Sequence, residues 1–166
     1  MTDPSSTPAP DATARAGAAP AVHPPSHIRA TWEGAHLFDT GRPNGPTARF
    51  DGTAKSAQTP PDALLSALAS CAGIDVVDYL AKRRTPVTSL AVDVQADRRE
   101  LHPRRFEQIR LRFEIGGTEI DRSHAERAVR LAFERYCSVA ASLAPDIDIF
   151  ALMVLNGEDG EPMRIV

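Results

Sequence analysis

The clearest structural signal in this chain lies at residues 59–84, TPPDALLSALASCAGIDVVDYLAKRR. Thr59 suits a helix N-cap, Pro60 fits the first helical position, and Asp62 stands three residues after the cap, as in a capping box. Apolar side chains then recur at helical spacing, namely Leu64, Leu65, Leu68, Cys71, Ala72, Val76, Tyr79 and Leu80. Basic residues and Pro86 follow them. The stretch therefore predicts one long, deeply buried helix of about 24 residues.

Beyond Pro86 the apolar pattern changes to a period of two, which is typical of strands with one buried face. The alternating apolar positions are Leu90, Val92, Val94 and Ala96, and then Ile109, Leu111, Phe113 and Ile115. Residues 97–105 between the two sets are polar and contain Pro103, as expected for a surface turn. The pattern predicts a pair of strands joined as a hairpin.

Three shorter strands are expected before the helix, at residues 27–32, 33–38 and 47–52, with a turn at 41–46. They would form an antiparallel meander. A small sheet of this kind is marginal when it stands alone. We therefore expect the chain to be an obligate dimer.

After the hairpin, Ser123 and Glu126 offer a capping box for a second helix. Cys137 lies at or just beyond the expected end of that helix. A short helical segment at 138–143 and a final strand at 147–155 complete the pattern. The predicted fold class is α+β, with antiparallel sheets, a long central helix and a second helix.

Length and composition restrict the classes of protein to which the chain can belong. Its 166 residues, 42% of them hydrophobic, suit a single domain with one core. The formal charge of −3 provides no overall attraction to nucleic acid or to an anionic membrane. No stretch approaches the ~20 apolar residues of a membrane-spanning helix. We expect neither nucleic acid nor a membrane as a partner.

The two ends of the chain differ in character from residues 26–158, which form the expected domain. Residues 1–25 are dominated by Pro, Ala, Ser and Thr, and we expect a disordered tail there. Residues 159–166 are expected to be a C-terminal tail. The N-terminus has no positively charged segment ahead of an apolar core, so it does not resemble a secretory signal, and a cytoplasmic location is the expectation.

The chain contains two cysteines, Cys71 and Cys137, and their spacing suits neither a disulfide framework nor a zinc site. In a reducing compartment a permanent disulfide is unusual. The cysteines are therefore either inert core residues or a functional redox pair. His102 and His124 show no ligand spacing, so no metal site is expected.

Several segments of the sequence resemble the OsmC/Ohr superfamily of small thiol-dependent peroxidases. The helix PPDALLSALASCAGIDVVDYLAKRR with the strand after it resembles the family's central helix and following strand, and ERYCSVAASL resembles its second cysteine element. HPRRFEQIRLRFEIGG, between them, resembles its second long strand. The likeness runs from about Thr31 to Gly157. The segments ASCAGIDVV, HPRRF and RYCSV are closer to the less characterised OsmC-like branch than to the organic hydroperoxide resistance branch.

This resemblance implies an intertwined homodimer in which each chain's meander embraces its partner, with active sites at the interface. It also implies a peroxidase of organic hydroperoxides, acting in oxidative stress defence without a cofactor. Cys71 would be the reactive thiol, and Cys137 would condense with its sulfenic acid to form a disulfide. An external dithiol, such as a lipoylated protein, would then restore the pair.

The family's best studied branch supports its thiolate with a Glu and an Arg, and other residues occupy both positions here. The Glu position is occupied by Pro61, and the nearest acid is Asp62, which is at least as well suited to cap the helix. His36 falls at the Arg position, and Arg42, a few residues on, is the alternative donor. Asp75 lies one turn after Cys71. Because a carboxylate there opposes thiolate formation, we expect it to pair with a cation or a backbone group.

Two other functions stay open at this point. The chain could be a non-catalytic module on the same fold, binding a small apolar ligand or sensing redox state through its thiols. The departures at the Glu and Arg positions favour this alternative. A purely structural dimer with two inert cysteines is the third possibility. Consumption of cumene hydroperoxide with dihydrolipoamide or dithiothreitol is the measurement that best distinguishes these functions, and the separation of the Cys71 and Cys137 sulfur atoms is a cheaper observation.

Overall fold

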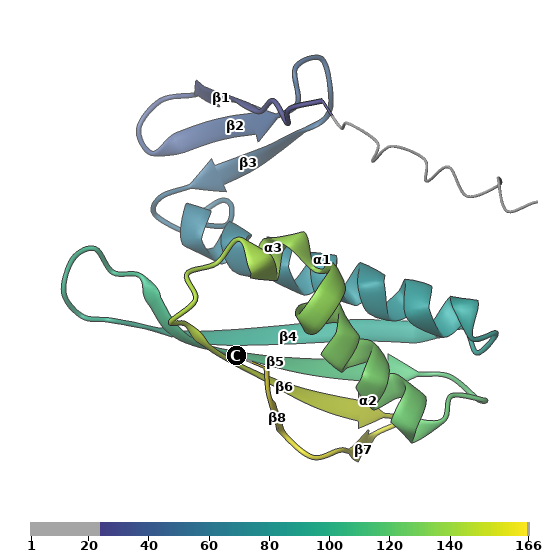
Figure 1. Cartoon of the computed structure of the whole chain (residues 1–166). Helices are drawn as coiled ribbons and strands as arrows, with labels where there is room; N and C mark the ends of the chain where they lie inside the picture. Colours follow the sequence, from purple (N-terminus) through teal and green to yellow (C-terminus); the bar gives the residue numbers. More distant parts are fainter. Residues whose placement is uncertain (1–23, 166) are drawn as a thin grey trace, which may run out of the picture.

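The computed structural model describes residues 24–165, so most of the expected N-terminal tail lies outside the described residues. The chain forms two sheets and a group of helices (Figure 1). The smaller sheet contains β1 (Arg29–Trp32), β2 (Leu37–Gly41) and β3 (Thr47–Asp51). The larger sheet contains β4 (Ser89–Arg98), β5 (Phe106–Gly116), β6 (Asp148–Leu155), β7 (Glu158–Asp159) and β8 (Met163–Arg164). The helical elements are α1 (Pro60–Lys82), α2 (Arg122–Leu131), the π-helical turn η1 (Ala132–Tyr136) and α3 (Ser138–Ala141). The predicted α+β class is confirmed.

The expected hairpin is formed by β4 and β5, which pair antiparallel. Each apolar position of one strand lies opposite an apolar position of the other, with Leu90 paired to Ile115 and Val94 to Leu111. This register places both apolar rows on the same face of the sheet, because side chains alternate along a strand. The helices cover that face (Figure 1). The period-two pattern thus predicted both the pairing and the buried face.

The last part of the chain completes the larger sheet. β6 pairs parallel to β5, after the chain has crossed over through α2, η1 and α3. β8 then pairs antiparallel with β6, and Met163 is buried. The segment 159–166, which the sequence analysis sets apart as a tail, therefore includes a strand that extends this sheet.

Helix α1 begins as the sequence predicts. The Asp62 backbone N–H donates to Thr59 Oγ1 at 3.3 Å, and the Asp62 carboxylate accepts from Thr59, which forms the capping box. The buried side chains repeat along one stripe of the helix, at Leu68, Ala72, Val76 and Leu80. This stripe packs on the larger sheet and on the other helices.

The opposite face of α1 is less covered than the sequence predicts. In the most apolar 18-residue stretch of α1, only 28% is buried, and the Ile74 side chain is 62% exposed. By length and composition alone α1 could cross a membrane, so the expectation that no stretch is apolar enough is not met. The core helix of a soluble protein meets the same criteria, and carboxyl groups such as Asp75 and Asp78 within the helix are costly in a bilayer.

The second helix is capped by a different residue from the one expected. Asp121, rather than Ser123, is the N-cap of α2, and its carboxylate accepts the Ser123 backbone N–H at 2.8 Å. Asp and Ser are about equally good caps, so residue preference alone does not choose between two neighbouring positions. The helix consequently begins two residues before the predicted box would place it.

The three-stranded meander is confirmed, and it forms a separate sheet near the start of α1 (Figure 1). Its second strand is β2 and not the expected 33–38, because residues 33–36 form the turn that precedes it. Its strands bury little of their own surface, and Trp32 lies opposite Phe38 with both side chains exposed. Asp51 at the end of β3 is the exception. Its carboxylate is buried and accepts five hydrogen bonds from the loop at Thr53, Lys55 and Ser56. This carboxylate therefore orders the connection into α1.

Candidate redox site

Cys71 lies in the middle of α1, beside the stripe of residues that pack on the sheet. Its side chain is half-buried, and it packs against the core without being enclosed by it. Asp75 follows one turn later and shares this side of the helix. This side faces the helical segments η1 and α3, against which α1 packs.

Cys137 is positioned by the junction of two short helical elements. It ends the π-helical turn η1, with its N–H donating to the Ala132 carbonyl at 2.7 Å, and it is also the N-cap of α3. Its Sγ accepts the Ala140 backbone N–H at 3.4 Å. Single π-helical turns are rare and are often found at functional sites. Here the turn is followed directly by the buried thiol, which agrees with the predicted place of Cys137 at the end of the second helix.

Three side chains meet between these elements. The sulfur atoms of Cys71 and Cys137 and a carboxylate oxygen of Asp75 all lie within 4.8 Å of one another. Both cysteines are free thiols. The fold therefore brings together the two cysteines that the sequence analysis named, and adds an acid to them.

Burial determines the ionisation of the Cys137 thiol. The side chain is only 2% exposed, and desolvation raises its pKa from 9.0 to about 11. The Ala140 N–H opposes this shift and the neighbouring Cys71 adds to it. At neutral pH Cys137 is consequently held as the protonated thiol.

Asp75 has no partner of the kind expected from the sequence. Its Oδ2 atom is buried, and no described residue forms a hydrogen bond with it. Desolvation raises the pKa of this carboxyl group, the nearby charge of Asp78 raises it further, and Lys82 opposes both. The expected pairing with a cation or backbone group is wrong for this oxygen. Spacing along a helix does not reveal which other segments pack against it.

The sequence of this chain matches a known protein family over more than half of its length. The model of the OsmC-like protein family matches residues 52–150, which include both cysteines and Asp75. The chain belongs to the OsmC family. Protein YhfA from Escherichia coli strain K12 is 34% identical over 122 residues, covering 73% of this chain and 91% of YhfA.

Solved structures of OsmC proteins share the architecture. An OsmC-like protein from Mycoplasma pneumoniae superposes with a TM-score of 0.71 at 17% identity, covering 81% of this chain and 99% of that protein. The organic hydroperoxide resistance protein OhrB of Bacillus subtilis has a TM-score of 0.52 at 14% identity, covering 78% of this chain and 96% of OhrB.

The three supporting residues suggested by the OsmC resemblance are not brought to the thiols within one chain. His36 and Arg42 are exposed in the turns of the smaller sheet, and Asp62 caps the start of α1. None of them has a described hydrogen bond or ion pair to either cysteine. Asp62 lies nine residues before Cys71, about 13 Å along the helix. Asp75 is instead the acid beside the thiols.

The donor set at this site and the nearby cavities bear on what could bind there. Two thiols and a carboxylate suit a thiophilic divalent cation such as zinc, but structural zinc sites use four protein ligands.

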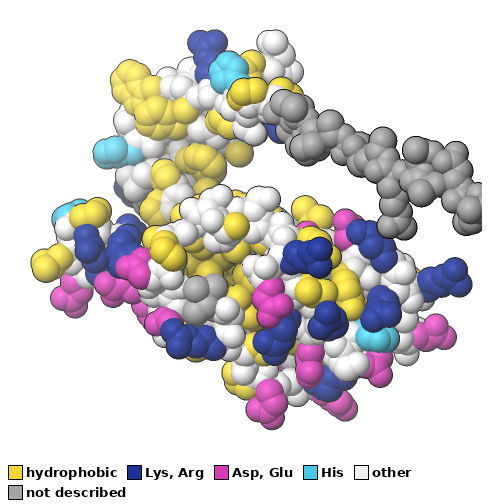
Figure 2. Space-filling model, in the orientation of Figure 1, with side chains coloured by type: hydrophobic (Ala, Val, Ile, Leu, Met, Phe, Trp, Pro, Cys, Tyr) yellow, Lys and Arg dark blue, Asp and Glu magenta, His cyan; other side chains and the backbone are white. Residues whose placement is uncertain are grey.

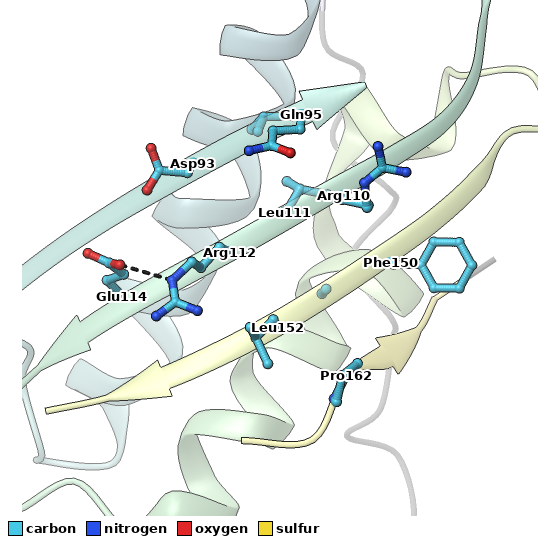
Figure 3. A pocket seen from close by; sticks show the side chains of 11 residues that line it. Asp93, Gln95, Arg110, Leu111, Arg112, Glu114, Phe150, Leu152 and Pro162 are labelled. Carbon is cyan, nitrogen blue, oxygen red and sulfur yellow. Dashed lines mark hydrogen bonds and ion pairs between the residues drawn. The ribbon is translucent and has the colours of Figure 1, made fainter. Parts of the chain in front are cut away.

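A cavity of about 720 Å³ lies between α1 and β4 and is lined by Gly73, Ile74, Val77, Leu90 and Val92, among others. A second hollow, of about 650 Å³, lies on the outer face of the larger sheet, opposite the helices (Figure 3). Its charged lining residues are Asp93, Arg110, Arg112 and Glu114. They lie on the face of the sheet away from the thiols.

Proposed function

We propose that this OsmC protein is a thiol-dependent peroxidase that reduces organic hydroperoxides, with Cys71 as the attacking thiol and Cys137 as its resolving partner. The observation that carries the proposal is the approach of the two sulfur atoms to within 4.8 Å. Membership of the OsmC family supports a redox or stress role. The likeness of fold to an organic hydroperoxide resistance protein is consistent with this role.

Burial distinguishes the roles of the two thiols. Only a thiolate attacks a peroxide efficiently, so the attacking cysteine must be able to ionise and to meet its substrate. Cys137 is buried and its pKa is raised to about 11, whereas Cys71 is only half-buried. Cys71 is therefore the better placed of the two to react with a hydroperoxide. Cys137 belongs to the hydrophobic core and Cys71 packs against it, and these apolar surroundings favour a substrate with an apolar tail.

The proposed reaction has two steps within the protein. The Cys71 thiolate attacks one peroxide oxygen, the O–O bond breaks, and the products are Cys71 sulfenic acid and an alcohol that has taken up a proton. The Cys137 sulfur then attacks the Cys71 sulfur, displacing water and forming the disulfide. An external dithiol, which could be a lipoylated protein, reduces the disulfide and completes the cycle. A cytoplasmic location, where such reductants are kept reduced, is part of this proposal.

We also propose that the working form is a homodimer. Ile74 and Leu64 on α1, and Trp32 and Phe38 on the smaller sheet, are large apolar side chains left exposed by the single chain. Figure 2 shows hydrophobic side chains gathered over the smaller sheet, whereas Lys, Arg, Asp and Glu dominate around α2. A second copy would cover both apolar surfaces. A role for His36 or Arg42 at the thiols requires this partner, because neither side chain reaches them within its own chain.

Turnover is the direct test of this function. The full chain should consume cumene hydroperoxide continuously when dithiothreitol or dihydrolipoamide is supplied, and faster than it consumes hydrogen peroxide. Cys71→Ser should abolish the reaction. The proposal fails if the wild-type chain consumes no hydroperoxide with either dithiol.

A thiol redox sensor is the second candidate function. It is favoured by the absence, among the described residues, of any hydrogen bond or ion pair from Arg, Lys or His to Cys71. Without such a cation the thiolate is less stabilised, and attack is slower. A sensor would form the Cys71–Cys137 disulfide once, at low peroxide, and would show little turnover with excess dithiol.

A further inference from the structure

The carboxyl group of Asp75 lies in the thiol cluster but takes no part in the two steps of the reaction proposed above. It lies within 4.8 Å of both sulfur atoms, on the same side of α1 as Cys71. Among the described residues it is the only group other than the two thiols in this cluster. Its position therefore allows it to act on either cysteine.

The burial of Asp75 is costly for the folded protein. A buried polar atom without a hydrogen-bond partner destabilises the native state, and such atoms are uncommon. Oδ2 of Asp75 is of this kind, and the pKa of the group is raised chiefly by desolvation. An acid kept in such a place, beside reactive groups, is a candidate for proton transfer.

In the second step of the reaction, the thiol of Cys137 must give its proton to an acceptor. Cys137 must lose its proton to attack the sulfenic acid, yet burial keeps it protonated at neutral pH. The backbone N–H of Ala140 points at the sulfur as a donor, so it cannot take the proton. Asp75 is the basic group within reach, either directly after a small rotation or through one water molecule.

We propose that Asp75 is the proton acceptor for Cys137 during disulfide formation. This inference rests on the peroxidase function proposed above. As the Cys137 sulfur attacks Cys71, the S–S bond forms and the S–O bond of the sulfenic acid breaks. The Cys137 proton passes to the Asp75 carboxylate and then to the departing hydroxide, which leaves as water. Asp75 ends the step ionised, and no further proton, oxidant or reductant is consumed.

The raised pKa of Asp75 suits this role. A carboxylate with a higher pKa is a stronger base, and general-base catalysis is most efficient when the pKa of the base approaches the working pH. Because the proton leaves while the new bond forms, the protein avoids a free, buried thiolate at Cys137. Before the reaction, the Asp75 carboxylate opposes ionisation of a neighbouring thiol. During disulfide formation, the same carboxylate assists by accepting the proton of Cys137.

The test separates the two chemical steps by rapid mixing with one equivalent of cumene hydroperoxide. In a Cys137→Ser background, peroxide consumption reports the first step alone. In the two-cysteine protein, disulfide formation after the sulfenic acid reports the second. Asp75→Asn should not slow the first step, because it removes a carboxylate that opposes ionisation of the neighbouring thiol, and it should slow the second step by about 10²-fold at neutral pH. The deficit should narrow as the pH approaches 11, where Cys137 ionises without help.

Asp78→Asn is the matched control, because it removes an exposed carboxylate one turn further along the same helix. It should leave both rates within about twofold of the wild type. Equal rates of disulfide formation in Asp75→Asn and wild type would overturn the proposal, as would a loss confined to the first step. Stoichiometric zinc in the purified wild type that is lost in Asp75→Asn would also overturn it, since the carboxylate would then be a ligand. A wild type that forms no sulfenic acid at all would refute the peroxidase function itself, which the first-step measurement reveals separately.

Discussion

The sulfur atoms of Cys71 and Cys137 lie within 4.8 Å of each other although the residues stand on different helical elements. One belongs to the middle of α1 and the other caps α3. Two thiols this close can be joined by small side-chain movements, provided that the backbone geometry of a disulfide is met.

Oxidation by one equivalent of an organic hydroperoxide should join the two cysteines. Mass spectrometry of the intact protein should show a loss of about two mass units in the wild type, and a gain of oxygen in Cys137→Ser. Cys71→Ser should keep its mass, because its remaining thiol is buried and protonated. An unmodified wild type with both thiols resistant to alkylation would mean that the cysteines only fill the core.

Alkylation of Cys137 should depend strongly on pH. With its pKa raised from 9.0 to about 11, its thiolate fraction at neutral pH is about a hundredfold below that of an ordinary thiol. In a Cys71→Ser background, labelling by iodoacetamide should be very slow at pH 7 and rise steeply up to about pH 11. Rapid labelling at pH 7 in the native state, with denatured protein as the reference, would contradict the burial of this thiol.

Replacing Asp75 by Asn should stabilise the folded protein at neutral pH. The folded-state pKa of Asp75 is raised by desolvation above its ordinary value of 3.8, so the folded state binds this proton more tightly than the unfolded state. Ionisation then favours unfolding as the pH rises through the raised pKa. Urea denaturation should show a gain for Asp75→Asn at pH 7 that disappears as the pH falls to about 3.8. A less stable variant at pH 7 would show that the carboxylate has a stabilising partner.

Asp51 should have the opposite pH dependence. Hydrogen bonds from Thr53 and Ser56 hold the pKa of its carboxyl group well below the ordinary 3.8. Its stabilising contribution is therefore present above pH 3.8 and is lost as the pH falls toward the depressed value. Asp51→Asn should lower the melting temperature by several degrees at pH 7 and by less in acid. Asp39→Asn, which breaks one exposed ion pair with Arg49, is the control and should change it little.

A charge at Ile74 should dissociate the proposed dimer. This side chain is 62% exposed on the uncovered face of α1, and an interface would bury it. Sedimentation at micromolar concentration should show a dimer for the wild type and a monomer for Ile74→Glu. Leu101→Glu at the hairpin tip, where the side chain is 79% exposed, should stay dimeric. A monomeric wild type would refute the dimer.

Local patterns in the sequence determined most of the secondary structure. The capping residues of α1 and the alternation along β4 and β5 act between near neighbours, so the long helix, the pairing of the two strands and their buried face could be predicted directly. The choice of Asp121 over Ser123 as the cap of α2 could not, because the two residues have similar preferences. The strand at Met163–Arg164 also escaped prediction, since two residues carry no period.

The chemistry of the site was decided by the tertiary structure. The spacing along α1 predicted that Asp75 and Cys71 lie on the same side of the helix. Cys137 comes close to both only because η1 and α3 pack against α1. Burial and the loss of hydrogen-bond partners depend on residues distant in the sequence, and these raise the pKa of Asp75 and of Cys137. The sequence alone therefore named the two cysteines, and the fold made the acid between them part of their site.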